Sequence, residues 1–197
     1  MKLRIPTCKI PAISVPISIA RESIIDSSHV CTLIRETPQK IEFSMKADDG
    51  TSFTTRIANN LREECVVVEM QYQEKFENGE RFVVFSRRVD RCIEKVLEHE
   101  EGALSGYVVP AFYKDIAVLQ YVVPLQYGFL SDQEYVDQLG IALVQCSKAM
   151  ALMCTIVNDL FAAGRLLSDK ECMRSVYRGY GYLVPSVSAE QAAGRPN

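Results

Sequence analysis

The sequence has no tryptophan and only two histidines, His29 and His99, among its 197 residues. It has no P-loop, G-x-G-x-x-G, G-x-S-x-G or H-E-x-x-H motif. His29 and Cys31 lie two residues apart in a predicted strand, which places their side chains about 7 Å apart. This distance is too long for the direct hydrogen bond of a catalytic pair. The Asp48-Asp49-Gly50 run is typical of a turn and lacks the later glutamate of a calcium loop. We therefore expect no enzyme, no cofactor and no metal site.

An excess of charge of either sign is also absent. The chain carries 22 Lys and Arg against 25 Asp and Glu, a net charge of −3, which argues against a strongly basic nucleic-acid-binding protein. A composition of 48% apolar and 24% charged residues is that of a soluble globular protein. The charges are concentrated before residue 102, where 15 basic and 17 acidic side chains lie, against 7 and 8 after it. The charge-poor half indicates a buried or shared surface.

The seven cysteines show no C-x-x-C spacing, and their number is odd. They lie in apolar runs, where a free cysteine behaves as a small hydrophobic residue, so we expect a reducing, cytoplasmic location. Pro11 and Pro16 interrupt the N-terminal segment, which makes it a poor signal peptide. Residues 139–157 carry a single charge, Lys148. Because a lysine at the centre of a bilayer costs about 2.5–3.5 kcal/mol, we expect a buried core helix and no transmembrane segment.

The first half of the chain has the alternating apolar and polar pattern of an antiparallel sheet. Asp48-Asp49-Gly50 supplies the positive φ angles of a tight hairpin, and Asn78-Gly79 does so for a second one. Residues 11–26 are compatible with either a strand or a short helix. The predicted strands are 29–35, 41–46, 51–57, 65–73 and 81–86.

Three helices are predicted after residue 88. Apolar spacing predicts a short amphipathic helix over 89–102. Ser131 with Glu134, and Ser168 with Glu171, have the spacing of capping boxes, which begin a long and a shorter helix. The predicted bounds of these two helices are 131–164 and 168–179.

The long helix extends over about 48 Å and is apolar on several sides. Five apolar residues lie largely off its main apolar stripe: Ile141, Val144, Leu152, Ile156 and Ala163. Either the chain's own sheet or a second subunit must cover these side chains. The expected architecture is a single α+β domain over 1–184, an antiparallel meander packed with these helices, and 185–197 are expected to form a disordered tail.

A repeat links this architecture to function. Tyr107-Val108-Val109-Pro110 recurs at 121–124 and, more loosely, at 182–185. A residue before proline is extended, so 103–130 are predicted to form short extended segments, either strand ends packed on the core or edges that pair with another chain. With the long helix, they predict a non-enzymatic, self-associating assembly protein, a homo-oligomer that Met150→Asp would dissociate. Its predicted interface residues are Tyr107, Tyr113, Tyr121, Tyr127, Leu143, Met150, Met153 and Val157.

Two other functions stay open at this point. A sheet that grips an apolar helix encloses a cavity for an apolar small molecule, with Tyr107, Tyr121, Met150 and Met153 as lining. Alternatively, cations at the start of the 89–102 helix oppose its dipole, which indicates a role in contacts elsewhere, such as phosphate or RNA. A solvated face with Arg91–Glu94 and Lys95–Glu98 pairs would explain them equally. The residues of this third hypothesis are Arg87, Arg88, Arg91 and Lys95.

Overall fold

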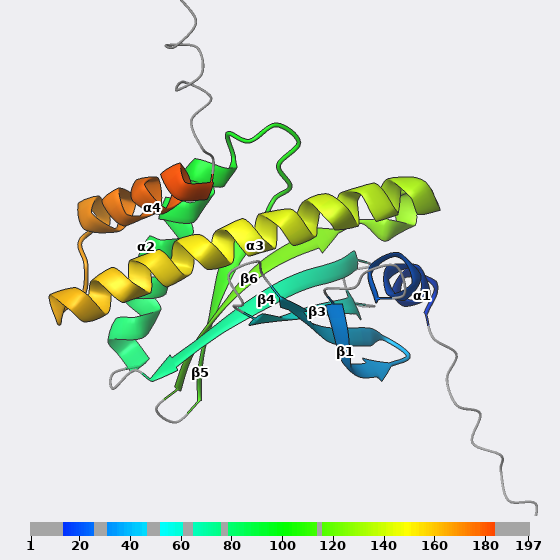
Figure 1. Ribbon diagram of the computed structural model, residues 1–197, viewed down its shortest axis with the longest axis horizontal. Helices are drawn as coiled ribbons and strands as arrows, with labels where there is room; N and C mark the ends of the chain where they lie inside the picture. Colours follow the sequence, from blue (N-terminus) through cyan, green and yellow to red (C-terminus); the bar gives the residue numbers. More distant parts are fainter. Residues whose placement is uncertain are drawn as a thin grey trace, which may run out of the picture.

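The computed structural model describes residues 14–25, 31–46, 52–60, 65–75, 79–113 and 116–183. The predicted α+β class is confirmed: a six-stranded antiparallel sheet, in the order β1-β2-β3-β4-β6-β5, packs with helices (Figure 1). In chain order, the elements are helix α1 (Val15–Ala20) with a π-helical turn (Arg21–Ile25), β1 (Cys31–Thr37), β2 (Lys40–Lys46), β3 (Ser52–Asn60), β4 (Cys65–Lys75), α2 (Gly79–Leu97), β5 (Tyr107–Tyr113), β6 (Ile116–Leu125), a 3-10 turn (Tyr127–Phe129), α3 (Asp132–Ala163) and α4 (Asp169–Leu183).

The strands show the alternation that the sequence predicts. On one side of the sheet the apolar side chains are buried beneath the helices, because α3 lies on β4 and β6 and α2 lies on β5. Helix α4 packs against α2 and α3. The predicted turn at 48–50, His29 and the predicted tail 185–197 lie outside the described residues. The buried residues of the sheet include Ile41, Phe43, Ile57, Val66, Val68, Met70, Leu119, Tyr121 and Val123.

The opposite side of the sheet carries a row of alternating charges. Arg35, Glu42, Arg56 and Glu69 face one another in register across β1 to β4. Arg56 Nη2 lies 2.5 Å from Glu69 Oε1. The 2.7 Å hydrogen bond from Lys40 Nζ, with the charges of the neighbouring arginines, holds the pKa of Glu42 below its usual range. This row is therefore polar from β1 to β4, and it becomes buried toward its end at Glu69 and the neighbouring Val122 of β6.

The predicted strand at 81–86 is wrong, because these residues belong to α2. The predicted helix over 89–102 in fact begins at Gly79 and ends at Leu97. Phe82, Phe85, Val89 and Ile93 are buried on one side of this longer helix, which is a helical spacing. The valines and phenylalanines of this short run favour a strand by composition, and the Asn78-Gly79 pair suggested a hairpin, but Gly79 instead begins the helix.

Helix α3 begins and ends where the sequence predicts. Ser131 caps it: Oγ accepts a hydrogen bond from the Glu134 amide (3.3 Å), and Glu134 Oε2 accepts one from the Ser131 amide (2.8 Å). Gly164 ends the helix in the left-handed conformation, at φ 62°. The capping box of Ser168 and Glu171 is also confirmed.

Helix α4 is longer than predicted, since it continues to Leu183. The third, looser copy of the Tyr-Val-Val-Pro repeat is therefore not an extended segment where the structure describes it: Tyr182 and Leu183 are helical. Proline restricts only the residue directly before it, so Pro185 leaves these two positions free to stay in the helix. The copies at 107–110 and 121–124 are extended, as predicted, within β5 and β6.

The chain itself covers most of α3. Length and composition alone would let this helix cross a membrane, yet 56% of its most apolar 18-residue window is buried within the chain. Strands β4 and β6 cover one side of it, and α2 and α4 flank it. A second subunit is therefore not needed to bury the main apolar stripe of α3.

Candidate functional site

The structure does not bring the predicted interface residues together on one surface. Tyr121, Met150, Met153 and Val157 are buried within the chain, so they are not available to a second subunit. Leu143 and Tyr127 are half-buried, and the Tyr127 ring packs edge-on against buried Tyr135. Tyr107 is 46% exposed, and the side chain of Tyr113 lies outside the described part of the structure.

The four residues predicted to line a cavity do not surround one. Tyr121 pairs in register with Val108 and points to the helices. Neighbouring Tyr107 therefore points to the opposite side of the sheet. Met150 and Met153 are fully buried in the packed core beneath α3. The apolar-carrier hypothesis thus loses the common cavity on which it depended.

The Tyr-Val-Val-Pro strands are poor sites for adding a strand from another chain. The second copy lies in β6, between β4 and β5, and so is not at an edge. The first copy lies in the edge strand β5, where the Val108 N–H donates to Asp90 Oδ1 of α2 at 2.6 Å. Pro110, two residues on, points its nitrogen to the same side and has no N–H. The outer edge of β5 therefore lacks two successive donors that strand addition needs.

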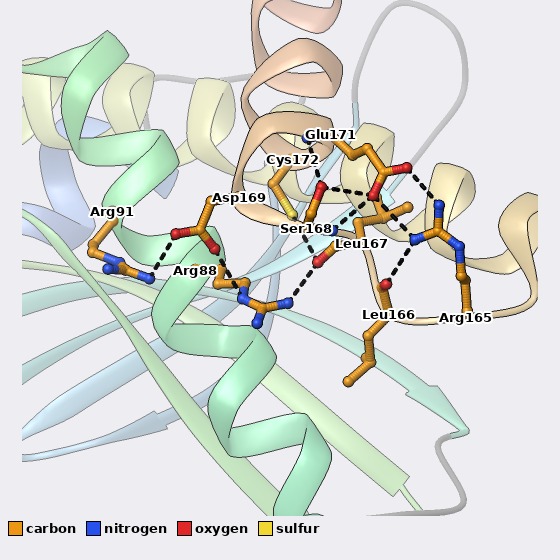
Figure 2. Close-up of polar contacts among 9 residues, drawn as sticks. All are labelled: Arg88, Arg91, Arg165, Leu166, Leu167, Ser168, Asp169, Glu171 and Cys172. Carbon is orange, nitrogen blue, oxygen red and sulfur yellow. Dashed lines mark hydrogen bonds and ion pairs between the residues drawn. The ribbon is translucent and has the colours of Figure 1, made fainter.

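Two of the four predicted anion-binding residues hold α4 against α2 instead (Figure 2). Arg88 Nε lies 2.9 Å from Asp169 Oδ1, and its Nη1 donates to the Leu167 carbonyl at 2.7 Å. Arg91 Nη2 lies 3.2 Å from Asp169 Oδ2. Because α2 begins at Gly79, these arginines lie in the middle of the helix, and the predicted conflict with its dipole is wrong. The other two, Arg87 and Lys95, are exposed on the outer side of α2.

Arg88→Met should loosen α4 rather than abolish anion binding. The change removes the ion pair to Asp169 and leaves the Leu167 carbonyl with only the weak 4.0 Å contact from the Cys172 thiol, so we expect a loss of about 1 kcal/mol in the free energy of unfolding. Urea denaturation measures this loss, and hydrogen exchange should show earlier exchange in α4. Arg87→Met, on the exposed side of the same helix, is the control and should change stability by less than about 0.5 kcal/mol. Equal effects of the two variants would contradict this role of Arg88.

A groove of about 520 Å³ lies between the N-terminal half of α3 and the loop 98–106. Its floor is apolar: Gly140, Ile141 and Val144 of α3 are exposed there, with Ile141 41% and Val144 57% accessible. We call this feature the α3 groove. It is lined by Glu100, Glu101, Ala103, Val136, Asp137, Gly140, Ile141, Val144, Gln145 and Lys148.

Gln145 fixes the loop that forms one wall of the α3 groove. Its Nε2 donates to the Leu104 carbonyl at 2.7 Å, and its Oε1 accepts from the Leu104 amide at 2.9 Å. Nε2 also donates to the Tyr121 hydroxyl at 2.9 Å. Burial raises the pKa of Tyr121 to about 12, so the hydroxyl stays neutral. Gly106 packs so closely that a Cβ there would lie 2.4 Å from Tyr121 Oη. The wall is thus held by buried contacts.

Glu100 closes one end of the groove. Lys148 Nζ lies 2.7 Å from Glu100 Oε2, and the Tyr180 hydroxyl of α4 donates to Oε1 at 3.0 Å. This carboxylate is therefore neutralised by the one cation in the lining. The other two acids of the lining, Glu101 and Asp137, have no basic partner among the described residues, although Asp137 accepts a hydrogen bond from Gln133. The rim of the groove is acidic.

The titratable side chains of the groove lining are Glu100, Glu101, Asp137 and Lys148. No cluster of three or more His, Cys, Asp or Glu side chains that could hold a metal ion occurs in the described ranges. Burial raises the pKa of Cys146 and Cys154, and it raises that of Cys172 to about 11. These cysteines therefore remain thiols at neutral pH. The chemistry that the groove does offer is apolar contact combined with negative charge.

The sequence carried only a weak signal for this groove. Ile141 and Val144 lie off the main apolar stripe of α3, but so do Leu152 and Ile156, which are buried. Glu98, Glu100 and Glu101 form an acidic run shortly before β5. Only the packing brings the two segments side by side. Compared with protein-family models, curated proteins and solved structures, the chain shows no significant match to any of them.

Proposed function

We propose that this chain is a non-enzymatic protein-interaction module, and that its α3 groove docks an apolar helical segment of a partner that also carries basic residues. The observation that supports this most directly is the combination in one groove of exposed Ile141 and Val144 with an acidic rim. A soluble chain gains by covering exposed apolar side chains that lie next to one another, at roughly 25 cal/mol for each Å² buried.

The floor of the groove suits a helix. Apart from the neighbouring residues and backbone of α3 itself, no described atom lies within 4 Å of the position that a Cβ of Gly140 would occupy, so a partner backbone has room to approach α3 closely there. Ile141 and Val144 then stand as a ridge beside this gap. Their helix is held from beneath by the sheet, so docking costs little ordering of the groove itself.

The rim selects the charge of the partner. Glu101 and Asp137 attract Lys and Arg side chains and repel acidic ones, since neither is neutralised by a described cation. Both side chains are exposed, so salt screens this attraction. We expect the affinity for a basic partner to fall as the ionic strength rises.

A library of amphipathic helical peptides, with one fixed apolar face and variable flanking charges, tests the proposal. We expect the intact chain to enrich peptides with basic flanks. Val144→Asp should lower their affinity tenfold or more, a change of about 1.4 kcal/mol or more. Phe161→Asp is the matched control, because Phe161 is an exposed apolar residue of α3 outside the groove lining. Equal recovery of acidic and basic peptides, or full binding by Val144→Asp, would overturn the proposed function.

A further inference from the structure

We infer that the segment docked in the α3 groove is helix α2 of a second copy of this chain, so that the protein self-associates head to tail. The inference rests on the proposed function and adds to it the identity of the partner. The self-association interface predicted from the sequence consisted largely of residues that are buried in the structure; the interface inferred here consists of two exposed surfaces.

The first of these surfaces is the outer side of α2. Val84, Arg87, Arg91 and Lys95 follow one another at spacings of three and four residues, which places them in one stripe along the helix. We call it the α2 basic stripe. Val84 is 52% exposed, and the three cations are also exposed. The stripe thus combines an apolar side chain with positive charge, which is the chemistry that the α3 groove recognises, and the exposed carboxylates of Glu94 and Glu98 lie beside its C-terminal end.

The charges of the stripe are largely unused within the described part of the chain. Neither Arg87 nor Lys95 has an acidic partner among the described residues, so the predicted Lys95–Glu98 pair is not seen. Arg91 pairs with Asp169 through one 3.2 Å contact between two exposed side chains. Such a contact contributes little by itself, so Arg91 keeps much of its capacity to pair elsewhere.

The stripe and the groove match in length and in charge. From Val84 to Lys95 a helix rises about 16 Å, and the part of α3 that forms the groove floor, from Val136 to Lys148, rises about 18 Å. Three cations meet Glu101 and Asp137, while Glu100 is already paired with Lys148. When Val84 packs against Ile141 and Val144, in the middle of this stretch, an antiparallel α2 carries Arg87 and Arg91 toward Asp137.

The stripe of one chain does not reach its own groove. On the opposite side of α2, Phe85, Val89 and Ile93 are buried against the core. The Asp90 bond to β5 and the Arg88 contacts to α4 (Figure 2) hold the helix in this orientation. The stripe is exposed on the other side of the helix. A second copy is therefore needed to bring the two surfaces together. Because the surfaces differ, the contact is heterologous, and copies join in a row or close into a ring.

Sedimentation velocity on the full chain tests this arrangement with two variants. Val84→Asp damages only the stripe, and Val144→Asp damages only the groove. We expect the wild type to associate with rising concentration and each variant alone to remain monomeric. An equimolar mixture keeps one intact stripe and one intact groove, so it should give a heterodimer and nothing larger. Phe161→Asp should associate like the wild type.

A charge exchange tests the role of the rim in the same assay. Arg87→Glu with Lys95→Glu should weaken association about tenfold or more, and adding Glu101→Lys with Asp137→Lys to the same chain should restore it. A wild type that stays monomeric, or a Val84→Asp variant that still associates, would overturn the inference. In that case, continued binding of basic peptides through Val144 would leave the proposed function standing. If the chain neither self-associates nor binds basic peptides, the inference and the proposed function are both refuted.

Discussion

Replacing Met150 by aspartate is expected to unfold the protein, not to dissociate an oligomer. Met150 has no accessible surface, and it lies on the side of α3 that packs into the core. A carboxylate there has neither water nor a cation to compensate its charge, and its burial costs several kcal/mol. We expect the free energy of unfolding to fall by more than about 4 kcal/mol, a large share of the roughly 5–15 kcal/mol of an ordinary domain.

Far-UV circular dichroism and urea denaturation of Met150→Asp measure this effect. Val144→Asp is the matched control, because it places the same charge on the same helix but at an exposed position of the groove floor. We expect the control to keep a native spectrum and a stability within about 0.5 kcal/mol of the wild type. A folded Met150→Asp chain that merely sediments as a smaller species would restore the interface that the sequence suggested and contradict the packing of α3.

Gln145→Leu is expected to cause the second largest loss. The side chain is buried, and its amide satisfies both backbone groups of Leu104 and the hydroxyl of Tyr121. Leucine fits the space but leaves these groups without partners, at a cost of about 1–3 kcal/mol for a buried polar group that loses its bond. We expect the free energy of unfolding to fall by about 3 kcal/mol and the loop 98–106 to lose its attachment to α3.

Hydrogen exchange of the Leu104 amide reports this attachment directly, and denaturation gives the total loss. Adding Tyr121→Phe to Gln145→Leu should recover part of the stability, because it removes the orphaned hydroxyl. Gln133→Leu, on the exposed first turn of α3, is the control and should change stability by less than about 0.5 kcal/mol. If Gln145→Leu were as mild as this control, the wall of the α3 groove would not depend on Gln145. Peptide binding by the Gln145→Leu variant would then show how far docking depends on a fixed wall.

Local signals predicted the helix boundaries that depend on short-range hydrogen bonds. The boxes at Ser131 and Ser168 and the left-handed Gly164 involve residues only a few positions apart, so no distant packing was needed to place them. The alternating strands β2, β3 and β4 were equally readable, since each has one buried and one polar side. The strand predicted at 81–86 is wrong because a short run of valine and phenylalanine after an Asn-Gly pair also suits a buried helix side.

The candidate site was less predictable, because it depends on what covers each side chain. Met150 and Val144 are both apolar residues of one helix, yet one is fully buried and the other is 57% exposed. Arg88 and Arg87 are neighbours, yet only Arg88 meets Asp169, which lies 81 residues further along the chain. Neither composition nor sequence spacing distinguishes the two residues of such a pair.

The sequence by itself determined that the chain is α+β, that its antiparallel strands have one apolar side, and that a capped helix of 32 residues follows them. These features arise from backbone hydrogen bonding and side-chain periodicity, which act over a few residues. The tertiary structure alone decided that the chain's own sheet and helices cover most of α3, that Arg88 and Arg91 join α2 to α4, and that an acidic loop lies beside Ile141 and Val144. Such contacts join residues distant in sequence, and burial is a property of the assembled layers.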